Sequence, residues 1–133
     1  MMSKVTYNGD LRTEAYHIQS GISIVTDAPI DNQGKGEAFS PTDLVATALA
    51  SCMLTIMGIV AERNDIELKG TTAEVEKIMG SEPRKIDKIE INIFFKKNFD
   101  KKSKLKLESA ASTCPVSNSL NVSLKKYINF IYP

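Results

Sequence analysis

The feature that most constrains this chain is an uncharged run of eighteen residues, 44–61, with the sequence LVATALASCMLTIMGIVA. Ser40 and Pro41 precede it as a helix N-cap and a first helical residue, and Asp43 places a negative charge in the first turn. The run is therefore predicted to be a helix. Because it carries apolar side chains all round, it must be buried on nearly every side.

Small and polar residues recur at helical spacing within this run and form a stripe along one face: Thr47, Ser51, Thr55 and Gly58. Such a stripe lets another backbone approach closely. A chain of 133 residues has too few other elements to surround the helix completely. We therefore expect a second copy of the protein to cover the exposed face, which predicts a homodimer.

The same run reaches the lower length limit of a membrane span. A second span and a basic flank at the N-terminal end are both missing from the sequence, and the other segments alternate like strands. The expectation is a buried helix rather than a membrane protein. The first ten residues, MMSKVTYNGD, do not form a secretory signal, so we expect a cytoplasmic location.

Composition fits a single globular domain over residues 1–133, with 42% hydrophobic and 25% charged residues. The 17 basic and 16 acidic residues leave a net charge of +1, too little to hold nucleic acid or an anionic membrane. One histidine and two cysteines cannot supply the four ligands of a zinc site. We expect no metal and no cofactor.

The segments around the helix predict an α+β fold with antiparallel sheets. Residues 4–26 alternate as a three-stranded meander, and residues 27–40 form a loop with no periodicity. Residues 66–79 and 85–97 predict a hairpin around a turn at 80–83. One face of the second strand then carries Ile89, Ile91, Ile93 and Phe95.

The C-terminal third predicts two helices and a strand. Residues 100–113 have helical composition and end at Cys114, because a residue that precedes proline is pushed out of the helical region. A short helix restarts at Pro115, and residues 122–132 read as the last strand.

Two cysteines, Cys52 and Cys114, are the candidate reactive groups. Cys52 lies in the middle of the apolar helix, whereas Cys114 lies at a helix N-terminus, which lowers the pKa of a thiol. Free cysteine is most often a small buried apolar residue. Taken alone, the residues leave two interpretations open, a pair of structural cysteines or a redox pair.

Each cysteine lies in a sequence motif. Residues 39–53, FSPTDLVATALASCM, are similar to the pattern S/N-P-x-[ED]-L…A-x-x-[AS]-C, and residues 113–120, TCPVSNSL, are similar to C-P-V-S-x-x-L. Both patterns occur, in this order, in the OsmC/Ohr family of osmotically induced and organic hydroperoxide resistance proteins. The resemblance extends from about Lys4 to the C-terminus, and it favours the redox interpretation.

The resemblance implies an α+β fold in which two chains interlock, with the cysteine-bearing helix at the centre and two sites at the dimer interface. It also implies that Cys52 is the peroxidatic cysteine and Cys114 the resolving cysteine of an organic hydroperoxide reductase. Cys52 would become a sulfenic acid, Cys114 would condense with it to a disulfide, and an external dithiol would reduce the pair. Phe39, Met53 and Ile56 would offer an apolar wall to the substrate.

The family's helper residues are an arginine from the N-terminal strands and an acid near the start of the long helix. The chain has three arginines, and Arg12 is the candidate because it lies in the predicted meander. A mid-helix cysteine gains nothing from a helix terminus, so a cation such as Arg12 is needed to favour the Cys52 thiolate.

Asp43 is the candidate acid, although Thr42 stands where the hydroperoxide reductases have glutamate. Asp43 could instead serve only the helix dipole, and Glu14 or Glu37 could take the role of the acid. The form Ser-Pro-Thr-Asp-Leu resembles the less characterised OsmC-like branch. The alternative function is a non-enzymatic dimeric protein that binds a small apolar ligand or a thiol carrier and whose cysteines are structural.

Overall fold

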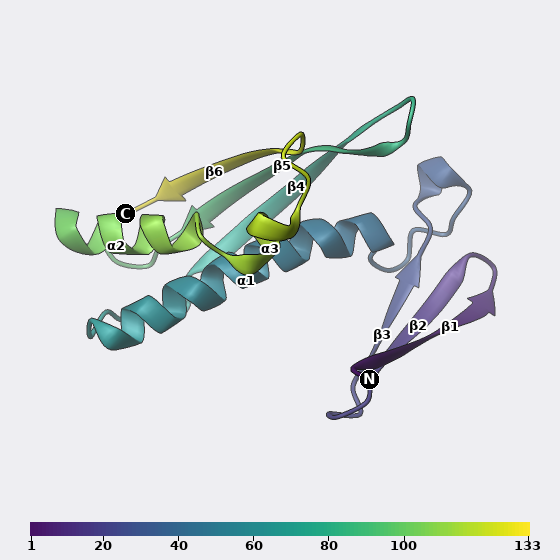
Figure 1. Ribbon diagram of the computed structural model, residues 1–133, viewed down its shortest axis with the longest axis horizontal. Helices are drawn as coiled ribbons and strands as arrows, with labels where there is room; N and C mark the ends of the chain where they lie inside the picture. The colour runs from purple at the N-terminus through teal and green to yellow at the C-terminus, as the bar shows by residue number, and fades with distance from the viewer. The chain divides into compact units, whose positions relative to one another are not determined.

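The computed structural model describes residues 1–133. It contains two compact units, Met1–Val45 and Ala46–Pro133, which are described separately below. Along the chain the elements are β1 (Ser3–Gly9), β2 (Arg12–His17), β3 (Ser23–Asp27), η1 (Ile30–Asn32), α1 (Pro41–Arg63), β4 (Thr72–Gly80), β5 (Lys85–Phe94), α2 (Lys101–Ala111), α3 (Pro115–Ser119) and β6 (Lys125–Ile131), as Figure 1 shows. This order confirms the predicted α+β class.

The first unit is the predicted antiparallel meander, with strand order β1-β2-β3. Asp10 and Leu11 join the first two strands with φ values of 54° and 60°. These left-handed conformations define the two-residue hairpin turn whose twist matches that of the flanking strands. The Leu11 amide donates to the Tyr7 hydroxyl at 3.3 Å, which gives this strained turn an additional polar contact.

The two faces of this small sheet differ in chemistry. Val5, Ala15 and Ile24 form one cross-strand row, and Val5 and Ile24 are 62% and 46% exposed. Side chains alternate along each strand, so the opposite face carries Arg12, which pairs in register with Asp27. The meander therefore sets an arginine directly across from an acid.

The loop after β3 folds back on the end of that strand. The Asp27 amide donates to the Phe39 carbonyl at 3.0 Å. A Cβ added to Gly34 would lie 1.7 Å from the Ala28 carbonyl oxygen, so only glycine allows this close return. The segment predicted as an irregular loop is thus an ordered turn that brings residue 37 back to Asp27.

Helix α1 begins at a reciprocal cap. The Asp43 amide donates to Ser40 Oγ at 3.0 Å, and the Ser40 amide donates to Asp43 Oδ2 at 2.9 Å. The two side chains satisfy amides that have no partner within the helix. The predicted helix start is confirmed, and the helix continues to Arg63.

One chain buries only one face of α1, which agrees with the expectation that 133 residues cannot surround this helix completely. One third of its most apolar stretch of eighteen residues is buried. By length and composition alone, the helix could cross a membrane. The buried side chains share one face: Ala46, Leu49, Ala50, Met53, Met57 and Ala61. The opposite face leaves exposed Val45, Ala48, Ser51, Thr55 and Ile59. The partial burial has a simple cause, because the rest of the second unit packs on one side of the helix.

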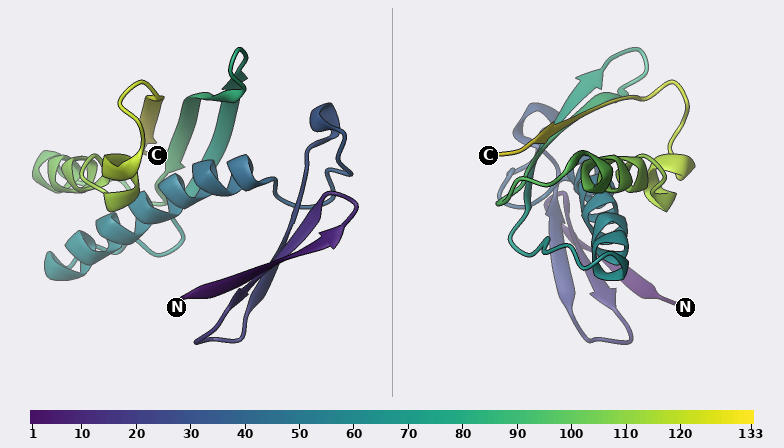
Figure 2. Two further views of the ribbon diagram at one scale, coloured as in Figure 1. Left: turned by 45° about the vertical axis from the view of Figure 1, so that its right-hand side comes forward. Right: turned by 90° about the vertical axis from the view of Figure 1, so that its left-hand side faces the viewer.

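The second unit places one sheet against its helices, with strand order β4-β5-β6. Figure 2 shows α1 and α2 on the same side of this sheet. Ile89, Ile91 and Ile93 are fully buried on the inner face of β5, as the sequence pattern predicted, and pack in one core with residues of α1 and α2. Burial of these branched side chains stabilises the unit by roughly 1.5 to 3 kcal/mol each.

The last strand differs from the expectation of antiparallel sheets. β4 and β5 pair antiparallel as a hairpin, but β6 pairs parallel to β5. Parallel neighbours need a long crossover connection, and here α2 and α3 provide it. The second sheet is therefore mixed.

The predicted strand at 66–79 is too long at its start. β4 begins at Thr72, because Gly70 with φ +89° and the turn around it separate Ile66 and Leu68 from the sheet. Both of these side chains still pack on the core, which explains why their apolar character resembled a strand.

An aromatic cluster closes the C-terminal end of the core. Phe95 and Tyr132 stack with ring centroids 4.4 Å apart, and Phe99 meets both rings edge-on. The Tyr132 hydroxyl is buried without a hydrogen-bond partner. Burial and the charge of Glu108 raise the pKa of Tyr132 to about 12.

Replacing Tyr132 by phenylalanine should stabilise the protein. The change removes an unsatisfied buried hydroxyl and keeps the stacked ring, so Tyr132→Phe should raise the free energy of unfolding by about 1 kcal/mol. Urea denaturation measures the difference. The control is Tyr127→Phe, at a tyrosine that is 50% exposed, which should change little. A destabilised Tyr132→Phe would mean that the hydroxyl makes a hydrogen bond.

Candidate redox site

Cys52 lies on α1, two turns beyond the end of the first unit. Its side chain is partly buried and packs against the core, between the buried Met53 and the exposed Ser51. The sequence indicated a cysteine in the middle of an apolar helix, and the structure confirms this.

Cys114 lies at the junction of α2 and α3. It adopts an extended conformation, φ −68° and ψ 142°, because Pro115 follows it and begins α3. Its side chain is fully buried, and its Sγ accepts a hydrogen bond from the Ser117 amide at 3.3 Å. The predicted position of the sulfur beside helical amide groups is confirmed.

The two thiols interact, although they are far apart in the sequence. Burial is the main cause that raises the pKa of Cys114, and a hydrogen bond with Cys52 and the charge of a Cys52 thiolate raise it further. The Ser117 amide acts in the opposite direction. The amides at the start of α3 lower the pKa of Cys114, as expected of a helix N-terminus, but its pKa is raised overall because desolvation outweighs these donors.

This arrangement makes the two thiols chemically different. Both are free, one partly open and one fully buried. Cys114 keeps its proton at neutral pH because its pKa is raised above that of an ordinary thiol. Two neighbouring free thiols can be oxidised to a disulfide, and Cys52 is the more exposed residue of the two.

The surface beside this helix is an open groove. It has a volume of about 430 Å³ between α1 and the edge strand β4 and is lined by Thr47, Ala50, Ser51, Leu54, Thr55, Ala73 and Val75. The sequence predicted that Met53 would form part of an apolar wall for the substrate. Met53 is instead 2% exposed and belongs to the core. The groove contains most of the predicted small-residue stripe.

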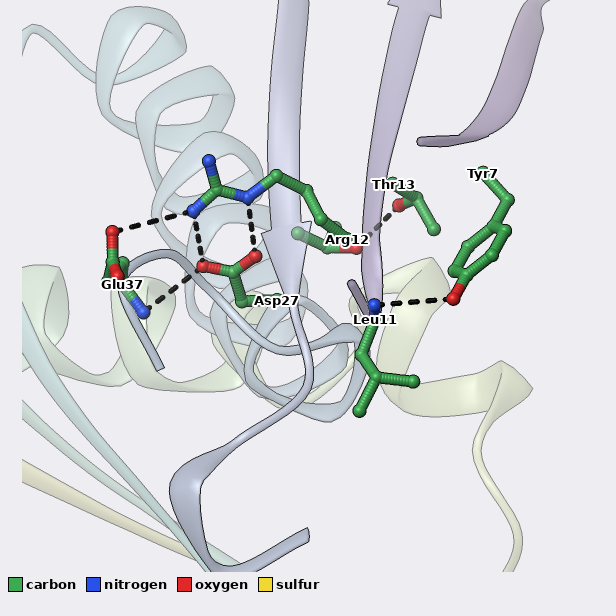
Figure 3. Close-up of polar contacts among 7 residues, drawn as sticks. Tyr7, Leu11, Arg12, Thr13, Asp27 and Glu37 are labelled. Carbon is green, nitrogen blue, oxygen red and sulfur yellow. Dashed lines mark hydrogen bonds and ion pairs between the residues drawn. The ribbon is translucent and has the colours of Figure 1, made fainter. Parts of the chain in front are cut away.

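Arg12 belongs to the first unit and is held by two acids, as Figure 3 shows. Its Nε lies 2.7 Å from Asp27 Oδ1, and its Nη2 lies 2.8 Å from Asp27 Oδ2. Nη2 also lies 3.7 Å from Glu37 Oε2, and the Glu37 amide donates to Asp27 Oδ2 at 3.1 Å. This two-point contact fixes the plane of the guanidinium.

The ion pair changes the titration of both partners. The hydrogen bond from Arg12 is the main cause that lowers the pKa of Asp27, and it outweighs the burial that would raise it. The same hydrogen bond with Asp27 raises the pKa of Arg12. Both groups therefore stay charged at neutral pH, and the remaining exposed part of Arg12 can meet an anion.

The acids beside Arg12 were only partly found from the sequence. The sequence offered Glu37 as an alternative for the acid beside Arg12, but it did not indicate Asp27. Asp43, the predicted acid, caps α1 together with Ser40. No local signal singled out Asp27, because its pairing with Arg12 depends on the register between β2 and β3. The catalytic role assigned to Asp43 stays a prediction.

No group of three or more His, Cys, Asp or Glu side chains is arranged to hold a metal ion. The two thiols lie in the second unit, and the arginine lies in the first.

Comparison with known proteins places these residues in context. A family model described as OsmC-like protein matches residues 34–126, which contain both cysteines. A Psychrobacter arcticus 273-4 protein, described as an osmotic stress induced and detoxification response protein, is 52% identical; the match covers 98% of this chain and 95% of that chain, with a TM-score of 0.95. No curated protein sequence matches the chain.

More distant solved structures share the fold alone. An organic hydroperoxide resistance protein OsmC from Legionella pneumophila is 16% identical with a TM-score of 0.77, over 98% of this chain and 97% of that chain. An OsmC like protein from Mycoplasma pneumoniae is 19% identical with a TM-score of 0.81, over 98% of this chain and 94% of that chain.

The Asp27 ion pair should make stability depend on pH. Because the folded state lowers the pKa of Asp27, the pair stabilises the protein at neutral pH, and this stabilisation is lost as the pH falls below about 4. The difference in Tm between wild type and Asp27→Asn should therefore be largest near neutral pH and shrink in acid. Glu14→Gln, at an exposed acid on β2, is the control. Equal Tm values for wild type and Asp27→Asn at every pH would contradict the prediction.

Proposed function

Because this chain belongs to the OsmC-like protein family, we propose that it is a thiol-dependent peroxidase that reduces organic hydroperoxides with Cys52 and Cys114. The observation that carries the proposal is the interaction between the two thiols, one partly open to solvent and one fully buried. Several structural relatives are organic hydroperoxide resistance proteins, which supports this choice of substrate.

The first step oxidises Cys52. Its thiolate attacks one oxygen of the hydroperoxide, the O–O bond breaks, and the other oxygen leaves with a proton as the alcohol. Cys52 becomes a sulfenic acid and the peroxide is reduced by two electrons. Cys52 is proposed for this role because its side chain is the more exposed of the two thiols.

The second step consumes Cys114. Its sulfur attacks the Cys52 sulfenic acid, the S–S bond forms as the S–O bond breaks, and hydroxide leaves with the Cys114 proton as water. An external dithiol then reduces the disulfide by thiol exchange and restores both thiols. We propose a cytoplasmic location, because a thiol pair that an external dithiol must reduce suits a reducing compartment.

Arg12 is proposed to favour the Cys52 thiolate and to orient the peroxide. Support comes from the two acids that hold its guanidinium plane while its side chain stays 33% exposed. A planar guanidinium can meet a thiolate and a peroxide oxygen together in a fixed fork geometry, which lysine lacks. Asp27 and Glu37 are thus proposed to position Arg12, and Asp43 to organise the start of α1.

A peroxide assay with cysteine variants tests the function. In stopped flow, reduced protein should consume cumene hydroperoxide faster than hydrogen peroxide and lose two thiols per molecule. Cys52→Ser should abolish consumption, because the attacking sulfur is gone. Cys114→Ser should allow one turnover and leave a sulfenic acid that dimedone traps.

The outcomes separate the two candidate functions. Thiols that stay reduced in stoichiometric cumene hydroperoxide would favour the non-enzymatic binding protein with structural cysteines. Equal dimedone trapping in both variants would overturn the assignment of roles.

We further propose that the protein acts as a homodimer. The exposed face of α1 is made of small or apolar side chains, and it borders the groove along the edge strand β4. Leaving this uncharged surface in water is unfavourable by roughly 25 cal/mol per Å² of apolar area, so a second copy would stabilise it.

Sedimentation at micromolar concentration should therefore give a dimer. Ser51→Arg, which puts a charge on the exposed face of α1, should shift the protein towards monomer, because the charge would lose its water in the interface. Glu62→Lys, near the end of α1, is the control. A monomeric wild type would contradict the proposed dimer.

A further inference from the structure

Lys126 is an unusual residue on the inner face of the second sheet. Alternation along β6 puts it in the same row as Ile128 and Phe130, which pack on the core. It lies in register with the fully buried Ile89 of β5. A lysine in an apolar row must carry its ammonium group to a polar partner.

The polar partner is Ser117 in α3. Lys126 Nζ donates to Ser117 Oγ at 2.9 Å and to the Ser117 carbonyl at 3.1 Å. Two hydrogen bonds from one charged donor hold both the side chain and the backbone of this serine. β6 and α3 are thereby joined at one residue.

Ser117 is also the residue that touches the buried thiol. Its amide donates to Cys114 Sγ at 3.3 Å. The ammonium group of Lys126, the serine and the cysteine sulfur thus form a continuous chain of contacts from β6 through α3 to the residue that caps it. The other groups that act on the sulfur are the Val116 amide and the Cys52 thiol.

We propose that Lys126 is a positioning residue for Cys114, acting through Ser117 to hold the amide that stabilises the Cys114 sulfur as it gains negative charge. The role of Lys126 in disulfide formation and reduction rests on the proposed peroxidase function. When Cys114 attacks the Cys52 sulfenic acid, its S–H bond breaks and its S–S bond forms. When the dithiol reduces the disulfide, the S–S bond breaks and charge returns to a cysteine sulfur.

The physical need for such a device follows from burial. A fully buried sulfur cannot use water to stabilise a thiolate, and the Cys52 thiol beside it opposes the second charge. A fixed amide donor is effective because it needs no reorganisation when the charge develops. The two hydrogen bonds from Lys126 to Ser117 keep that amide in place.

A titration of Cys114 alone tests the proposal without any peroxide. In Cys52→Ser protein labelled with ¹³Cβ-cysteine, the only cysteine NMR signal is that of Cys114. Adding Lys126→Met keeps the apolar stem but removes the charge and both hydrogen bonds, so the thiol should titrate at higher pH. Lys126→Arg should restore most of the wild-type curve.

Lys125→Met is the matched control. Lys125 is the preceding residue of β6, and it lines an outer-face groove with Asp87 and Tyr127 instead of contacting Ser117. It should leave the titration unchanged. If Lys126→Met does not fold, Lys126→Gln replaces it and should shift the curve in the same direction, because it also lacks the charge.

A second measurement follows the reaction. In otherwise wild-type protein, Lys126→Met should slow the conversion of Cys52 sulfenic acid to disulfide by about tenfold, as loss of a charge-assisted hydrogen bond implies, and leave the first oxidation unchanged. Identical Cys114 titration curves in the Lys126 variants and their parent would overturn the proposal. If wild type consumes no peroxide but the curve shifts, the proposed function fails while the positioning role stands.

Discussion

The packing of α1 against the isoleucine face of β5 is the contact on which the second unit depends. It removes Leu49, Met53 and Met57 from water together with the branched side chains of the sheet. A helix with no charge over eighteen residues has few other ways to remain folded in water. Because the sheet covers one side of α1, the opposite face stays exposed, and we propose that a second copy covers it. The same contact holds Cys52 at the border of the core.

Burial decides the chemistry of the second cysteine more than its helix position does. Cys114 accepts one amide hydrogen bond, which is worth about 1 kcal/mol, whereas desolvation of a thiolate costs several times that. The raised pKa of Cys114 follows from this comparison. Ser117 and Lys126 are then the groups that can reduce the free-energy cost of a buried Cys114 thiolate. This difference between the two thiols is what a peroxidatic and a resolving role require.

In the ion pair of the first unit, hydrogen bonding outweighs burial. Asp27 is 1% exposed, yet two hydrogen bonds from Arg12 keep it ionised against the desolvation that would protonate it. The glycine-dependent return of the loop adds the Glu37 amide and carboxylate to the pair. Three segments of the first unit thus orient one guanidinium, which suits a group proposed to meet an anion.

Local signals were sufficient for much of this protein. The uncharged run predicted a helix, and Ser40 and Asp43 predicted its start. The alternation of Ile89, Ile91 and Ile93 predicted a buried face, and the proline after Cys114 predicted a new helix. Each of these signals acts within a few residues, and the structure confirms these local features. The two cysteine motifs also identified the family. Local signals could not predict four other features. These are the parallel pairing of β6, the pairing of Arg12 with Asp27, the raised pKa of Cys114 and the contact of Lys126 with Ser117. They depend on segments that are distant in the sequence, and only the packed tertiary structure decides which of those segments meet and how much water remains between them.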